Sequence, residues 1–176
     1  MQLVLPASKY KDSFLEALKE YQKEKSSTYI RNLLLLDRAT LKENFSFYLE
    51  KLLDESKGKN LPSGYVSHTI YWLIDDDEFV GRVDIRHSLT ETLLREGGHV
   101  GYDIRPSKRN QGYGKKILAL VLTKAKELGL TRVLVTCDET NLASKKVIEA
   151  NGGIFENSVS MGEEKPRKLR YWIEIR

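Results

Sequence analysis

The apolar positions of the N-terminal third recur at the spacing of amphipathic helices. A short strand is expected at 2–5, and a helix from Ser8 to about Glu24. The apolar stripe of this helix consists of Phe14, Leu15 and Leu18. A second helix is expected to open at Thr40, and its apolar residues repeat every three or four positions: Phe45, Tyr48, Leu49, Leu52 and Leu53. The segments 26–37 and 57–64 are interpreted as loops.

From residue 68 the pattern changes to that of β-strands, rich in β-branched and aromatic residues. Residues 68–74 and 79–87 predict an antiparallel hairpin, joined by the acidic turn 75–78. A third strand is expected at 99–104. The segment 89–98 before it is interpreted as a linker or a half-formed helix.

Helical spacing returns at Gly112 and continues to about residue 128. A short apolar strand is expected at 132–136, and another helix at 141–151. Two closing strands are expected at 154–158 and 169–175. The resulting order is strand, two helices, three strands, helix, strand, helix and two strands.

This order predicts an α+β fold. We expect a mixed, mostly antiparallel sheet flanked by helices in a three-layer arrangement, because the strands and helices do not simply alternate. The 176 residues suit one domain spanning 1–176, and we find no internal repeat.

Composition and charge narrow the function classes. The net charge is +4 with both signs interspersed, whereas a nucleic-acid-binding protein usually concentrates its positive charge. No apolar run approaches the length of a membrane span, so we expect neither a nucleic-acid nor a membrane partner. Cys137 is the single cysteine, which fits a reducing cytoplasm and a small core residue. The spacing of His68, His87 and His99 is not that of a metal site, and no metal is expected.

The most informative segment runs from Tyr102 to Lys116, where a strand, a glycine-containing turn and a long helix follow one another. The first amides of a helix lack partners within it and bind anions, phosphates above all. Gly112 and Gly114 lack Cβ atoms, so a phosphate could approach the backbone closely. The basic residues at 108–116 form either a site for a small polyanion or a solvated face. The turn does not match the P-loop, because Lys116 stands where Ser or Thr is required, and it does not match the dinucleotide fingerprint, because position 117 is Ile in place of glycine.

A longer pattern is more specific. Arg109-x-x-Gly112-x-Gly114 follows a strand that ends in Ile104-Arg105-Pro106, and it resembles the coenzyme A signature of the GNAT family of N-acetyltransferases. Asn141-x-x-Ser144, with a glycine pair behind it, resembles the family's next motif. The resemblance to the family covers roughly residues 71–155, and the part from Arg86 to Asn157 looks closest to an uncharacterised bacterial acetyltransferase subgroup.

The resemblance implies an acyl-CoA N-acyltransferase fold and acetyl-CoA as cosubstrate. The acetyl group would pass directly to a primary amine of a small molecule or a peptide. Ile104 would pair through its main chain with the pantetheine arm and donate its amide to the oxyanion, and Arg109 would shape the loop. Asn141 would contact the pantetheine, act as a helix N-cap, or do both. The pyrophosphate would be held by the backbone of Gln111, Gly112, Tyr113, Gly114 and Lys115.

The general base and acid of the family are not found at their usual positions. The register places Gly98 where relatives often carry a glutamate, and Ile148 where many carry a tyrosine. We therefore predict that His99 or Glu96 relays the proton from the amine and that Ser144 assists the thiolate.

Two further questions stay open at this level. A catalytically silent acyl-CoA-binding module is the alternative to an active enzyme, since both usual catalytic residues are displaced. The protein is expected to be a monomer or a homodimer, and no segment carries a readable signature for the acceptor amine.

Overall fold

The computed structural model describes residues 1–24 and 35–175. The strands are β1 (Gln2–Val4), β2 (His68–Asp75), β3 (Glu78–Arg86), β4 (Val100–Ile104), β5 (Arg132–Asp138), β6 (Ile154–Val159) and β7 (Lys168–Glu174). The helices are η1 (Ser8–Tyr10), α1 (Lys11–Glu24), α3 (Arg38–Glu43), α4 (Phe45–Ser56), η2 (Leu93–Gly97), η3 (Pro106–Lys108), α5 (Tyr113–Glu127) and α6 (Leu142–Ala150).

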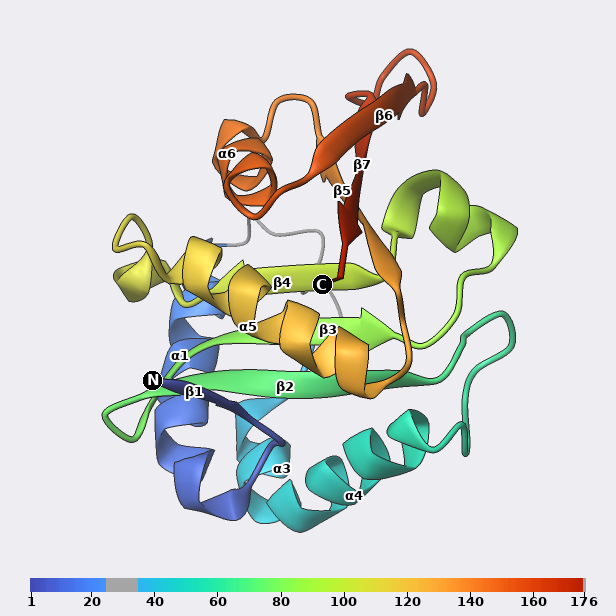
Figure 1. Ribbon diagram of the computed structural model, residues 1–176. Coiled ribbons are helices and arrows are strands. Elements are labelled where there is room, and N and C mark those ends of the chain that lie inside the picture. Colours follow the sequence, from blue (N-terminus) through green and yellow to red (C-terminus); the bar gives the residue numbers. More distant parts are fainter. Residues whose placement is uncertain (25–34, 176) are drawn as a thin grey trace.

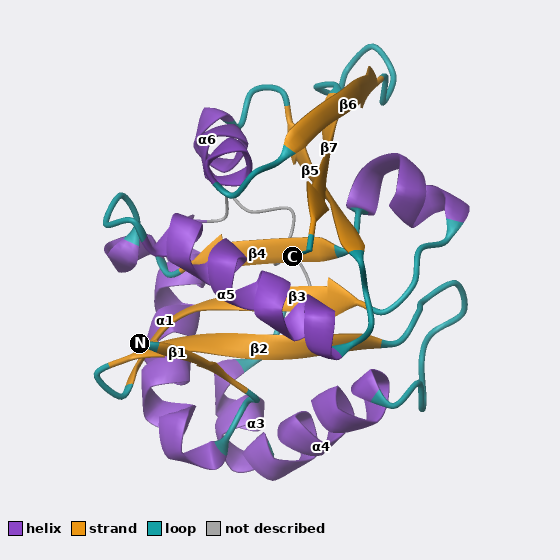
Figure 2. Ribbon diagram, in the orientation of Figure 1, coloured by secondary structure: helices purple, strands orange, loops and turns teal. Residues whose placement is uncertain are grey.

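The strands form one seven-stranded sheet in the order β1-β2-β3-β4-β5-β7-β6 (Figures 1 and 2). Every neighbouring pair is antiparallel except β4 and β5, which are parallel. The mixed, mostly antiparallel sheet flanked by helices confirms the predicted α+β class.

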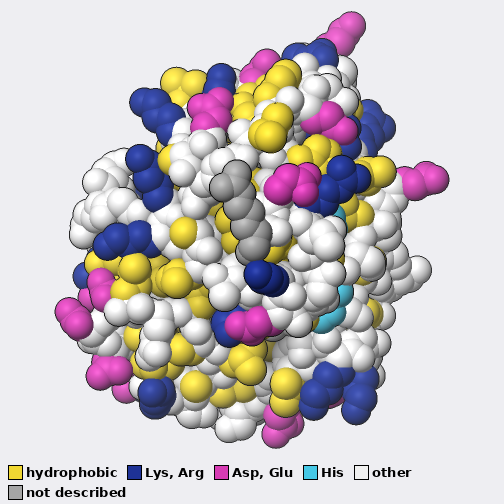
Figure 3. Space-filling view, viewed as in Figure 1, with side chains coloured by type: hydrophobic (Ala, Val, Ile, Leu, Met, Phe, Trp, Pro, Cys, Tyr) yellow, Lys and Arg dark blue, Asp and Glu magenta, His cyan; other side chains and the backbone are white. Residues whose placement is uncertain are grey.

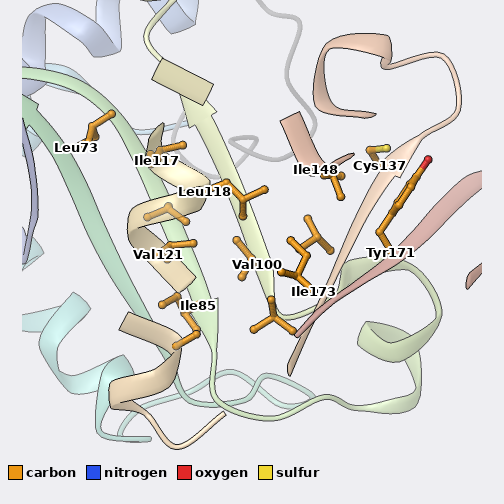
Figure 4. Packing of buried hydrophobic residues seen from close by; sticks show 14 of the residues in the cluster. Leu73, Ile85, Val100, Ile117, Leu118, Val121, Cys137, Ile148, Tyr171 and Ile173 are labelled. Atoms are coloured by element: carbon orange, nitrogen blue, oxygen red, sulfur yellow. The ribbon is translucent and has the colours of Figure 1, made fainter. Parts of the chain in front are cut away.

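Helices cover both faces of the sheet. On one face, α1, α3 and α4 bury their apolar stripes in a cluster centred on Trp72, where the rings of Phe14 and Trp72 stack with centroids 4.5 Å apart. On the other face, Ile117, Leu118 and Val121 of α5 lie over the strands, as Figure 4 shows. These two apolar clusters give the three layers expected from the element order.

One local expectation needs correction, whereas the half-formed helix expected as one alternative at 89–98 is observed. The helix expected from Thr40 consists of two helices, α3 and α4, which meet at Asn44. The cap of the first is Asp37, whose carboxylate accepts a hydrogen bond of 2.7 Å from the Thr40 amide. The segment 89–98 is partly ordered as η2, a single π-helical turn. Most of the loop expected at 26–37 lies outside the described residues.

The sheet opens between β4 and β5. These strands share a single register pair, Val100 with Val135, and β5, β7 and β6 then turn away from the first four strands (Figure 1). Main-chain groups alternate between the two edges of a strand, so Tyr102 and Ile104 direct theirs to the same edge as Val100. Their amides therefore face the opening.

Dark blue and magenta side chains, the basic and acidic ones, are interspersed on the face drawn in Figure 3. Within 1–24 and 35–175, no helix combines the length and apolar character that crossing a membrane requires.

Candidate active site

The opening of the sheet is the entrance to a cleft of about 870 Å³, which we call the β4–β5 cleft. Its wall comes from β4, the end of β5, and the first turns of α5 and α6. Two helix N-termini and an unpaired strand edge therefore meet in one cavity, and all three present main-chain donors.

The first turn of α5 presents the amides that the sequence predicts as an anion site. Gly112 caps the helix with a φ of +83°, a conformation that favours glycine. The first bonds toward the cap come from the amides of Lys115 and Lys116, 3.2 and 3.3 Å from the Gly112 oxygen. The amides of Tyr113 and Gly114 precede them and have no intrahelical acceptor.

The two glycines of the motif serve different purposes. A Cβ on Gly112 would point into open space, so its backbone conformation is the constraint. A Cβ on Gly114 would lie 3.1 Å from a methyl group of Val147, so this glycine lets α5 approach α6. The expectation that both glycines serve the approach of a phosphate is therefore too simple.

The side chain of Arg109 is turned into the protein. Its Nε donates to the Ile104 oxygen at 2.9 Å, and its terminal nitrogens pair with Asp103 at 3.1 Å and with Glu24 of α1. These contacts tie the loop to β4 and α1, and they neutralise the charge of the guanidinium. Arg109 thus lies where it can shape the loop.

Two other loop side chains also have partners within the protein. The amide of Gln111 donates to the Ser107 oxygen at 3.1 Å, and the hydroxyl of Tyr113 donates to Asp75 at 2.8 Å. What the loop offers a ligand is therefore its backbone, together with the exposed Lys115 at the rim of the cleft.

At the other side of the cleft, Asn141 caps α6. Its Oδ1 accepts a hydrogen bond of 3.0 Å from the Ser144 amide, so the N-cap interpretation of Asn141 describes its contact in this structure. Ser144 borders the cleft, and its hydroxyl lies 3.1 Å from the hydroxyl of Tyr102 on β4.

Tyr102 was not predicted as a site residue. Burial raises the pKa of its phenol to about 12, so the hydroxyl keeps its proton at neutral pH. The only signal in the sequence is its place two residues before Ile104 on the same strand face, which does not distinguish a functional tyrosine from a packed one.

The missing glutamate at Gly98 has a structural reason. Gly98 has a φ of +66°, and a Cβ there would lie 2.5 Å from the backbone oxygen of Leu134 on β5. No side chain fits at this point without moving the strands. Glu96, two residues earlier in η2, borders the β4–β5 cleft instead.

The surroundings of His99 oppose the predicted proton relay. Its side chain is 8% exposed, and its Nδ1 accepts a hydrogen bond of 2.9 Å from the Leu134 amide. Burial, with repulsion from Arg86 and Arg132, lowers the pKa of His99 to about 4. The ring borders neither of the cavities described here. His99 therefore links β4 to β5 as a neutral ring and is poorly suited to accept a proton.

A second cavity, of about 950 Å³, lies between the sheet and helices α3 and α4; we call it the helix-side cavity. His68, Asp84 and Arg86 line its floor from β2 and β3. Arg86 borders both cavities, and it donates to the oxygens of Gly97 and Gly98 at 3.1 and 3.0 Å. The two cavities thus meet at Arg86, a juxtaposition that sequence reasoning missed.

Cys137 is a free cysteine buried in β5. Burial raises the pKa of the Cys137 thiol to about 11, which suits a packed residue better than a nucleophile. Among the residues that the structure describes, no three His, Cys, Asp or Glu side chains gather in a way that could hold a metal ion.

Comparisons with known proteins agree with this geometry. The family model described as an acetyltransferase (GNAT) domain matches residues 11–154. A search of curated proteins by sequence found no significant match.

Similar solved structures include RimL, a ribosomal L7/L12 alpha-N-protein acetyltransferase, in complex with coenzyme A. It is 15% identical with a TM-score of 0.70, over 98% of this chain and 93% of that one. The microcin C7 self-immunity acetyltransferase MccE, in complex with acetyl-CoA and AMP, is 14% identical with a TM-score of 0.70, over 98% and 91% of the two chains. The yncA protein from Salmonella typhimurium, a putative acetyltransferase with its cofactor acetyl-CoA, is 11% identical with a TM-score of 0.65, over 99% and 94%.

At these identities the likeness shows the fold, whereas the family model covers most of the chain. The resemblance noted in the sequence is thereby confirmed. The protein belongs to the GNAT acetyltransferase family.

Proposed function

We propose that this protein transfers the acetyl group of acetyl-CoA directly to a primary amine of a small molecule or a peptide. The observation that carries the proposal is the meeting of two cavities at Arg86. One is lined by unpaired main-chain donors, and the other is large enough for an acceptor and carries charged side chains.

The β4–β5 cleft fits acetyl-CoA by its chemistry. The amides from Gln111 to Lys115 at the start of α5 suit a pyrophosphate, and the side chain of Lys115 adds positive charge at the rim. The free edge of β4 at Tyr102 and Ile104 suits the amides of a pantetheine arm, which would pair with it like an added strand. RimL, MccE and yncA, which share the fold, are structures with coenzyme A or acetyl-CoA bound.

Bound acetyl-CoA supplies a thioester carbonyl that an amine can attack. The β4 amides of Tyr102 and Ile104 are the donors available to the oxyanion that forms there. When the carbon–nitrogen bond forms and the carbon–sulfur bond breaks, the sulfur leaves with the electron pair. Ser144 would give it a proton, and Tyr102, hydrogen-bonded to Ser144, would replace that proton.

The amine must lose a proton before it attacks, because an alkylammonium has a pKa of roughly 10. Of the two predicted relays, Glu96 borders the β4–β5 cleft and His99 does not. We therefore assign the relay to Glu96, directly or through water.

The acceptor is proposed only as a class. RimL is an alpha-N-protein acetyltransferase of ribosomal L7/L12 and MccE is a microcin C7 self-immunity acetyltransferase, so acetyltransferases of this fold serve different purposes and the fold alone does not choose the acceptor. The helix-side cavity of this protein is the place where a small-molecule or a peptide amine would enter.

Calorimetric titration with acetyl-CoA tests the cosubstrate and its site. We expect Lys115→Glu to weaken binding roughly tenfold at low salt, because it reverses a charge beside the pyrophosphate. Lys126→Glu, in the last turn of the same helix, makes the same charge change far from the motif and serves as the matched control.

Equal weakening by both variants would contradict the proposed pyrophosphate site. No binding of acetyl-CoA by the wild type would overturn the proposed function. A wild type that binds acetyl-CoA but acetylates no primary amine would contradict the proposed acceptor class.

A further inference from the structure

The floor of the helix-side cavity contains a carboxylate whose capacity to accept hydrogen bonds is not used up. Asp84 on β3 is 9% exposed, and among the described residues no donor lies within hydrogen-bond distance of its Oδ1. Its other oxygen, Oδ2, lies 3.8 Å from Nη2 of the Arg86 guanidinium. A buried carboxylate costs free energy unless it is paired, so an unsatisfied oxygen beside a cavity points to a missing cation.

The other charged groups of this cavity have partners of their own. Arg86 donates to the oxygens of Gly97 and Gly98, which orients it toward η2. The carboxylate of Glu55 lies 3.6 Å from Nε2 of His68 and 3.9 Å from Nζ of Lys51. Asp84 thus differs from Glu55, the other carboxylate of the floor, in having unused acceptor capacity.

Asp84 is also well placed for the transfer reaction. Its partner across the β3–β4 pair is Gly101, which has no side chain to fill the space beside it. Neighbouring strands lie about 5 Å apart. The backbone of Asp84 therefore lies about one strand spacing from Gly101, the residue before Tyr102, whose amide faces the β4–β5 cleft.

The mouth of the same cavity is apolar. Phe47 of α4 is 70% exposed and Tyr65 is 56% exposed, and both line the cavity. Leu52 and Ile70 continue this apolar wall inward toward Asp84. Large apolar side chains that gather in the open around one cavity mark a surface for an apolar ligand.

We infer that the acceptor is a primary amine on an apolar body, and that Asp84 binds its ammonium group. Asp84 is a positioning residue: it holds the nitrogen between the two cavities while the apolar body lies against the mouth. An acceptor with its own carboxylate beside the amine is disfavoured, since that carboxylate would lie beside the carboxylate of Asp84. This inference rests on the proposed function and names the acceptor class of that site.

Steady-state kinetics with two matched probes test this assignment, at saturating acetyl-CoA. Benzylamine is a cation at neutral pH, whereas O-benzylhydroxylamine is a similar nucleophile that is uncharged there. We expect Asp84→Asn to raise the KM for benzylamine about 10- to 100-fold, because a charged hydrogen bond is lost. The KM for O-benzylhydroxylamine should change less than about threefold, because it brings no charge to Asp84.

Glu55→Gln is the matched control, because it removes a carboxylate from the same cavity by the same chemical change. It should leave the KM for benzylamine within about threefold of the wild type, since Glu55 is paired with His68 and Lys51. L-Phenylalanine, which adds a carboxylate beside the amine, should be a poorer substrate than benzylamine for the wild type.

The melting temperature distinguishes recognition from a structural role. Asp84→Asn should melt no lower than the wild type, because it replaces a buried charge whose only close partner among the described residues is Arg86 at 3.8 Å and whose Oδ1 accepts no hydrogen bond from them. Equal loss with the charged and the uncharged probe, or an equal effect of Glu55→Gln, would overturn the assignment of Asp84. A wild type that binds acetyl-CoA but acetylates L-phenylalanine and not benzylamine would overturn the acceptor class while leaving the proposed function intact. Failure to bind acetyl-CoA would instead overturn the proposed function.

Discussion

The two cavities of this protein have similar volumes, about 870 and 950 Å³, but they are built in different ways. The β4–β5 cleft is formed largely by consecutive residues of a loop, a strand edge and two helix starts, and its proposed ligand groups are mostly main-chain amides. The helix-side cavity is assembled from side chains of α3, α4, β2 and β3, most of which are spaced two to four positions apart along each element. A sequence motif can therefore indicate the β4–β5 cleft, whereas the lining of the helix-side cavity is recognisable only in the folded chain.

The largest expected effect tests whether the close approach of Gly98 to the β5 backbone explains why no carboxylate stands at this position. Gly98→Glu would restore the glutamate common among relatives, but its Cβ would lie 2.5 Å from the Leu134 oxygen at a φ of +66°. We expect a loss of about 4 kcal/mol in the free energy of unfolding, from strain and overpacking together. Urea unfolding measures this loss.

Gly112→Ala separates the two causes. Gly112 also has a positive φ, but a Cβ there meets open space, so only the strain of about 1 kcal/mol should appear. If Gly98→Glu is as stable as Gly112→Ala, the close approach of Gly98 to β5 does not explain the missing carboxylate.

The second largest expected effect is on the pH dependence of stability. It concerns His99, whose ring accepts a hydrogen bond from the Leu134 amide of β5. Its pKa is about 4 in the folded protein and about 6.5 when unfolded, so between these values the unfolded chain binds a proton that the native protein does not. Stability should therefore fall as the pH falls from about 6.5 to 4. From pH 7 to pH 5 the loss attributable to His99 is about 2 kcal/mol.

His99→Asn sharpens this test, because its Oδ1 can accept the Leu134 hydrogen bond without titrating. The variant should lose less stability than the wild type over the same pH range in urea unfolding. It should also retain most of the transfer activity. If the His99→Asn variant folds normally but loses transfer activity, His99 would be supported as the proton relay and its assignment as a structural residue would be wrong.

The smallest expected effect concerns a side chain of the β4–β5 cleft. Tyr102→Phe removes the hydroxyl that lies 3.1 Å from that of Ser144, and we expect kcat to fall about tenfold with the Kd for acetyl-CoA unchanged. Tyr171→Phe removes a hydroxyl of the same core whose hydrogen bond goes to Glu149, and it should leave kcat unchanged. Equal kcat values for the two variants would leave Ser144 without a partner in proton transfer.

Much of the fold was predictable because its signals are local. The stripe of Phe14, Leu15 and Leu18 is a periodic pattern that persists in the structure, and the β-branched and aromatic residues of 68–87 form the expected hairpin. The helix start at Arg38 was not predicted, because Asp37 and Thr40 are both acceptable caps, and the apolar spacing around Asn44 gives no signal for the break between α3 and α4.

The residues of the site also differ in whether a local pattern could indicate them. The turn at Gly112 and the cap at Asn141 were expected, since each depends on a few neighbouring residues. Tyr102 and Asp84 were missed because an isolated tyrosine or aspartate in a strand has no distinguishing pattern. The sequence left His99 and Glu96 open as the relay, and the burial that lowers the pKa of His99 to about 4 is a property that only the fold creates.

By itself, the sequence determined the order of the elements, the family and the position of the glycine turn that suits acetyl-CoA. These depend on the periodicity of side chains and on backbone conformations that few residues adopt. Only the tertiary structure decided that β4 and β5 diverge, that Gly98 leaves no room for a side chain, and that one carboxylate oxygen of Asp84 has no hydrogen-bond donor, within the part of the chain that the structure describes, at the floor of the helix-side cavity. Those properties arise where segments distant in sequence meet and exclude water, and no local pattern encodes which polar groups remain without partners there.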